Sequence, residues 1–150
     1  PYRWTLTAHL AKDSSTVPSQ GTFVITSDLT PPVTLLFQNF PNPFPNPTIG
    51  QRVTCLWFDL AHAGHVKLEI LDVQGHVVRR LIPGTAYGPI LRSGRYGRPL
   101  STDVAGCDPA LEWDGTAADG STVPRGIYIA KLESPDGVFF KRIVYLGPGA

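Results

Sequence analysis

Two Asp-Gly pairs lie five residues apart in the stretch WDGTAADGSTVPRG, and they are the first candidates for chemistry in this sequence. Asp114 and Asp119 supply carboxylate oxygens, of which Ca²⁺ needs roughly six to eight. The close spacing of a calcium loop, with a ligand at every second position, is missing. Asp-Gly is also typical of tight turns, where the Asp side chain bonds its own backbone two residues on. The stretch therefore predicts two turns, with Ca²⁺ as the alternative.

Four histidines raise the question of a metal site. His62 and His65 lie three apart in an expected turn, His76 begins an expected strand, and His9 is unplaced. If residues 73–74 form the tip of a hairpin, Leu71 pairs with His76. The strand rise then separates His65 from His76 by about 20 Å, too far for one shared ion. We therefore expect no metal and no cofactor.

Nucleophilic and acid–base catalysis find no support in the sequence. It has no Gly-x-Ser-x-Gly elbow, no Cys with a His placed to activate it, and no pair of carboxylates that stands out. We expect that the protein is not an enzyme. Cys55 and Cys107 fit one disulfide in an exported protein, although two buried thiols would give the same pattern.

An arginine-rich stretch, LRSGRYGRPL, places Arg92, Arg95 and Arg98 around Tyr96, with Tyr87 upstream. Arginine interleaved with aromatic residues can stack on bases or sugars. A net charge of +1 gives no electrostatic case for nucleic acid or an anionic membrane. Contact with a protein is the favoured interpretation of these residues, and contact with a glycan or the cell surface is the alternative.

The elements that must position these residues are short strands. Fifteen glycines and fifteen prolines in 150 residues indicate many tight turns. Alternating or apolar segments predict strands at 2–8, 21–27, 52–60, 65–71, 76–82, 110–113, 126–133 and 138–146, and no segment has a helical period. Residues 83–108 form an irregular insertion. No apolar run is long enough to cross a bilayer as a helix, so we expect no membrane insertion.

The chain divides into two predicted parts. Residues 1–30 form a β-hairpin and a linker, and residues 31–150 form a β-sandwich with the insertion at 83–108. A lone hairpin is at best marginally stable in water, so it needs something to pack against. Because the sequence lacks Met and opens within a strand pattern, we expect that it was cut from a longer precursor.

Four motifs occur in a characteristic order: FQNFPNPFPNPT, AGHVKLEILDVQGHVVRRL, EWDGTAADGSTVPRGIYIAKLES and FFKRIVYL. Together they resemble the immunoglobulin-like C-terminal modules of secreted bacterial proteins. Those modules are related to the Ig-like domain of the flagellar hook-capping protein and to sorting domains of type IX secretion. The resemblance covers residues 35–146. In two places the sequence departs from the family pattern, with Pro45 after the Asn-Pro-Phe triplet and a longer segment between Leu81 and Trp113.

The resemblance implies an all-β fold, an immunoglobulin-like sandwich of about seven strands, to which this chain adds the N-terminal hairpin. It also implies no catalysis, no cofactor, and export to the cell surface or the medium from a bacterium with an outer membrane. Residues 37–48, which we call the strap, are then expected to be stiff and polyproline-like. In that interpretation Phe37, Phe40 and Phe44 plug the open end of the sandwich.

Two functions fit these features. The main hypothesis is an exported structural subunit that exchanges strands head to tail with copies of itself, forming a filament or surface layer. The alternative is a sorting or anchoring module of a larger secreted protein, and a carbohydrate-binding module is a third possibility. The residues expected to form the subunit contact are Tyr2, Trp4, Leu6, Phe23, Ile25, Phe37, Phe40, Phe44, Tyr87, Arg95 and Tyr96.

Overall fold

The protein is described here by a computed structural model, which covers residues 3–10, 19–26, 30–97 and 107–149, with the backbone alone for the first two ranges. The prediction of an all-β fold is confirmed. The described residues form strands and two short 3-10 helices, η1 (Pro47–Ile49) and η2 (Pro109–Leu111), without an α-helix. Within these ranges, no helix has the length and apolar character to cross a membrane.

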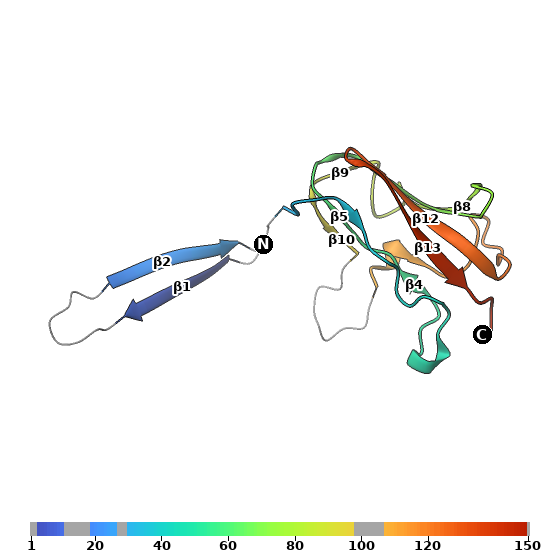
Figure 1. The fold of residues 1–150 in the computed structure, drawn as a ribbon, viewed down its shortest axis with the longest axis horizontal. Coiled ribbons are helices and arrows are strands. Elements are labelled where there is room, and N and C mark those ends of the chain that lie inside the picture. The colour runs from blue at the N-terminus through green and yellow to red at the C-terminus, as the bar shows by residue number, and fades with distance from the viewer. Residues whose placement is uncertain (1–2, 11–18, 27–29, 98–106, 150) are drawn as a thin grey trace.

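One layer is a four-stranded antiparallel sheet in the order β13-β12-β7-β8 (Figure 1). Its strands are β7 (Lys67–Leu71), β8 (Val77–Ile82), β12 (Gly126–Ser134) and β13 (Gly137–Tyr145). Alternate residues enter the core, as the period of two along a strand requires. Leu68 and Leu132 are cross-strand partners, and both are fully buried.

The other layer is built from smaller pieces. β10 (Gly94–Tyr96), β5 (Phe58–Leu60) and β3 (Leu35–Leu36) form a three-stranded sheet, while β4 (Thr54–Cys55) pairs with β11 (Glu112–Trp113) and β6 (Gly64–His65) with β9 (Ile90–Leu91). The predicted strand 52–60 is divided here into β4 and β5. The reason is a change of partner, because the backbone N–H of Leu56 donates to Leu111 and the carbonyl of Trp57 accepts from Phe37.

The core lies between the two layers. An aromatic cluster occupies one end of it, with the ring centroid of Trp113 5.4 Å from Phe44, 5.0 Å from Tyr128 and 5.8 Å from Tyr145. Aliphatic side chains fill the rest, among them Leu56, Leu60, Leu68, Ile70, Ile82, Leu111, Leu132 and Ile143.

The N-terminal hairpin consists of β1 (Arg3–Leu10) and β2 (Ser19–Thr26), which pair antiparallel over their full lengths. Its register places Trp4 opposite Ile25 and Leu6 opposite Phe23. Figure 1 shows the hairpin beside the sandwich and extending away from it. Within the described residues, β1 and β2 pair only with each other.

Three details of the sequence-based prediction were wrong. Leu71 pairs with Val77, not His76, because Asp72 Oδ1 accepts from the N–H groups of Gln74 and His76 and widens the turn. The insertion is not irregular throughout, since its described part contains β9 and β10. The strap bends instead of running as an extended polyproline segment, and the peptide bonds before Pro41, Pro43 and Pro45 are cis.

Candidate functional site: the strap and its anchor points

The strap leaves β3 and runs beside the outer edge of β13. The N–H of Phe44 donates to the carbonyl of Val144 at 3.0 Å, and the N–H of Leu146 donates to the carbonyl of Phe44 at 2.8 Å. The side chain of Asn42 adds two bonds, accepting from Val144 N–H at 2.8 Å and donating to the carbonyl of Arg142 at 3.2 Å. The strap thus takes the place of a neighbouring strand over the second half of β13, where a free edge would invite another chain.

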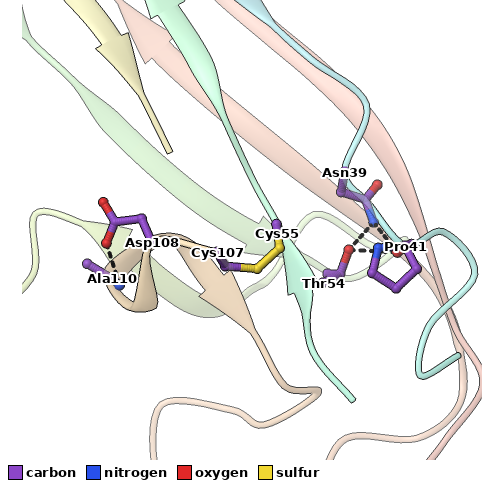
Figure 2. The surroundings of a disulfide bond; sticks show 7 residues. All are labelled: Asn39, Pro41, Thr54, Cys55, Cys107, Asp108 and Ala110. Carbon is purple, nitrogen blue, oxygen red and sulfur yellow. Dashed lines mark hydrogen bonds between the residues drawn. A yellow bond between two sulfur atoms is a disulfide. The ribbon is translucent and has the colours of Figure 1, made fainter. Parts of the chain in front are cut away.

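A buried polar cluster fixes the bend of the strap. Asn39 Nδ2 donates to Thr54 Oγ1 at 2.7 Å, and that hydroxyl donates to the carbonyl of Pro41 at 2.7 Å (Figure 2). Asn39 and Thr54 are both buried. Because a buried polar group without a partner costs about 1–3 kcal/mol, these mutual bonds specify one path for the chain.

The three phenylalanines of the strap have different environments. Phe44 has no exposed surface and packs on Trp113 and Tyr145 in the core. Its side chain is therefore inaccessible to another subunit, and the expectation that it forms a subunit contact was wrong. Phe37 is half-buried and stacks on Trp57. Phe40 is 57% exposed, so it extends from the surface instead of plugging the sandwich.

The disulfide lies next to the strap (Figure 2). Cys55 in β4 is bonded to Cys107, with 5.3 Å between the two Cα atoms. Cys55 also exchanges two backbone bonds with Phe40 of the strap, at 2.7 and 3.1 Å. One residue of β4 therefore holds both the strap and the chain that leads into η2 and β11.

The insertion is anchored at the same place. Asp108 Oδ1 accepts from the N–H of Ala110 at 3.0 Å, which caps η2, and its other oxygen accepts from the hydroxyl of Tyr87. Partial burial, together with the neighbouring Asp108 carboxylate, raises the pKa of Tyr87 to about 12. Tyr96 stacks on Phe58 with 5.0 Å between the ring centroids. Both tyrosines thus lie against the core.

The other residues of the expected subunit contact are not gathered in one place. Arg95 is exposed on β10, in the three-stranded sheet, whereas Phe40 lies on the strap. Trp4, Leu6, Phe23 and Ile25 lie in the hairpin, where the backbone alone is described, and Tyr2 lies outside the described residues. The subunit-contact role of the accessible members stays a prediction.

The two Asp-Gly pairs form turns. Asp114 Oδ1 accepts from the N–H of Thr116 at 3.1 Å, and Asp119 Oδ1 accepts from the N–H of Ser121 at 2.9 Å. This loop also covers the outer edge of β8, because the N–H of Ala118 donates to the carbonyl of Val78 at 3.1 Å. The described residues contain no group of three or more His, Cys, Asp or Glu side chains that could hold a metal ion.

Sequence reasoning missed a polar contact between three distant segments. Asp136, in the turn between β12 and β13, accepts from the hydroxyl of Thr34 and lies 2.7 Å from Nδ1 of His62. The Thr34 hydrogen bond, followed by the contact with His62, lowers the pKa of Asp136 below its usual value of 3.8. Thr34 Oγ1 also accepts from the N–H of Ala61. These residues lie up to 102 positions apart, so no local sequence signal could have found them.

A groove of about 580 Å³ opens where the strap ends. Pro45, Pro47 and Pro148 line it, with the exposed charges of Arg52 and Asp114 on its walls. Its lining presents one cation and one carboxylate, without a nucleophile paired to a base.

No protein-family model matches the chain, and no curated protein matches it. Among solved structures, it resembles PorZ of Porphyromonas gingivalis, described as an essential bacterial surface component of the type-IX secretion system. That match has a TM-score of 0.41 and 14% identity, and it covers 74% of this chain and 11% of PorZ. Dimeric latent PorU from Porphyromonas gingivalis gives a TM-score of 0.44 and 20% identity, over 87% of this chain and 11% of PorU. The chain thus spans about a tenth of the length of either.

Proposed function

We propose that the sandwich is a non-catalytic sorting or anchoring module of an exported protein. One observation carries this proposal. The four sequence motifs that resemble exported immunoglobulin-like modules contact one another in the folded sandwich. The strap hydrogen-bonds to the last motif through Phe44 and Val144, and the second and third motifs supply β7, β8 and β12 of the same sheet. The residues that resemble exported modules are therefore the ones that build and close the sandwich.

The polar residues support a structural role over a catalytic one. The carboxylates of Asp114 and Asp119 are used in turns, Asp136 joins distant segments, and Asp108 caps η2. The disulfide supports export, because such bonds persist in oxidising compartments and are rare in the cytosol. We infer that the module acts through its surface, and that the protein functions at the cell surface or outside the cell.

The filament hypothesis stays a prediction. One observation favours it, namely that the hairpin has an eight-residue ladder and pairs only with itself within the described residues. A sorting module needs no such hairpin. An export experiment on the whole chain therefore does not test the role of the hairpin.

The sorting role is tested by fusing the whole 150-residue chain to the C-terminus of a reporter that carries a signal peptide. The fusion is expressed in a bacterium with type IX secretion and in a matched strain whose secretion apparatus is deleted. We expect protease-accessible reporter on the surface, or reporter in the medium, in the first strain only. The reporter without the chain is the control. Equal retention of the fusion in both strains would overturn the proposal.

A further inference from the structure

The first half of the β13 edge differs from the second half. Along the second half, the groups that bond the strap belong to Arg142, Val144 and Leu146, which are alternate residues. Successive residues of a strand direct their backbone groups to opposite sides, so Val138 and Phe140 direct theirs to the same outer edge. In the described part of the chain, no strand is hydrogen-bonded to this stretch of edge, although β3 contacts β13 and Gln38 Nε2 donates to the carbonyl of Arg142 at its end.

The side chains at this free edge are apolar and exposed. Val138 is 50% exposed and Phe140 is 57% exposed. Their cross-strand partners in β12 are Glu133 and Lys131, which form an ion pair with each other at 2.7 Å. The edge thus combines backbone groups without a strand partner in the described residues and two accessible apolar side chains. The charged side chains opposite them, Glu133 and Lys131, neutralise each other. A strand added here would place its own alternate side chains beside Val138 and Phe140.

The N-terminal hairpin has, in its described residues, unpaired strand edges that could complement this edge of β13. Each of its strands pairs on one side only within the described residues. A two-stranded hairpin is at best marginally stable in water, and adding a third strand is the simplest way to stabilise it. Its sequence alternates apolar and polar residues in β1, where the apolar members include Trp4 and Leu6. In Figure 1 it extends away from its own sandwich, where another molecule can reach it.

We propose that the free edge of β13 at Val138 and Phe140 accepts a strand from the β1–β2 hairpin of a second copy of this chain. Main-chain hydrogen bonds supply the pairing, and Phe140 is the main side-chain contact. Donor and acceptor are different surfaces, so the contact is head to tail and continues from copy to copy unless the rotation closes a ring. This inference goes beyond the sorting role and does not depend on it.

The first test compares two matched variants of the full chain by sedimentation across a concentration series. Phe140→Lys places a charge on the acceptor edge, and we expect it to raise the dissociation constant about tenfold or more. Val77→Lys is the control, because Val77 is 50% exposed at the opposite edge strand of the same sheet. We expect it to associate like the wild type. Equal effects of the two variants, or a wild type that is monomeric throughout, would overturn the proposal.

A complementation experiment separates donor from acceptor. Val24→Pro breaks β2 and removes the donor, while Phe140→Lys removes the acceptor. Each variant alone should be monomeric, and an equimolar mixture should form a dimer that does not grow, since one functional donor meets one functional acceptor. A mixture that stays monomeric contradicts the proposal, as does one that forms long assemblies.

Amide hydrogen exchange of the wild type gives a readout that does not rely on mutation. We expect the amides of Val138 and Phe140 to become protected as concentration rises. Protection that is already complete in the dilute monomer would mean that the hairpin folds onto its own β13, which overturns the second-copy assignment. Absence of protection at the highest concentration also overturns it.

Discussion

At the scale of single residues, one close fit in the sandwich is between Gly115 and the ring of Tyr145. Gly115 has a φ of +82°, and a Cβ placed on it would lie 2.6 Å from the phenol oxygen of Tyr145. Two separate costs therefore oppose any other residue here, the left-handed backbone and the overlap with a buried ring. We predict that Gly115→Ala lowers the free energy of unfolding by about 3 kcal/mol, measured by urea denaturation.

Gly120 is the matched control for this prediction. Its φ is +84°, close to that of Gly115, but a Cβ there would meet nothing within 4 Å. Gly120→Ala should therefore carry the backbone cost alone, about 1 kcal/mol. If the two variants lose the same stability, Tyr145 does not constrain Gly115 and the steric part of the argument is wrong.

What the sequence predicts about single residues depends on how local their partners are. Asp114 and Asp119 bond the backbone two residues on, which Asp-Gly signals, and both turns were predicted. The contact of Asp136 with Thr34 and His62 requires the completed fold, and nothing near any of the three residues indicates it. The burial of Phe44 was missed for the same reason, since the strap alone does not show which ring faces Trp113.

At the scale of elements, the disulfide joins β4 to the segment before η2 and closes a loop across 52 positions. In the chain-entropy model, a loop of this length stabilises the fold by about 4 kcal/mol. We predict that Cys55→Ser/Cys107→Ser loses about that amount in urea denaturation, because its unfolded chain is no longer restrained. Reduced wild type should match the double variant. A double variant as stable as the oxidised wild type would show that the loop is restrained by other contacts.

Element positions were predicted well where the period of two is uninterrupted, as in β7, β12 and β13. Predictions were poorer where the backbone changes partner. The strand expected at 52–60 divides at Leu56, whose N–H bonds Leu111, and the turn before β8 is one residue longer because of Asp72. In both cases one hydrogen bond decides the boundary of the strand. The pattern of apolar residues does not show where the partner in that bond lies in space.

At the scale of the whole molecule, the hairpin and the sandwich are expected to be energetically separate. The strap, the disulfide and the aromatic cluster all involve residues after position 30, and β1 and β2 form no ladder with the described strands of the sandwich. Cooperative units that share few contacts unfold independently. The sequence predicts this division from the linker, and the division stays a prediction.

We predict that removing residues 1–29 changes the free energy of unfolding of the sandwich by less than about 0.5 kcal/mol at low concentration. The measurement is a urea titration followed by tryptophan fluorescence, in which Trp113 reports on the core. Val24→Pro in the full chain is the control, because it disrupts the hairpin without shortening the chain. A loss of several kcal/mol in both variants would mean that the hairpin packs on its own sandwich. Unchanged stability with lost association would locate the function of the hairpin between molecules.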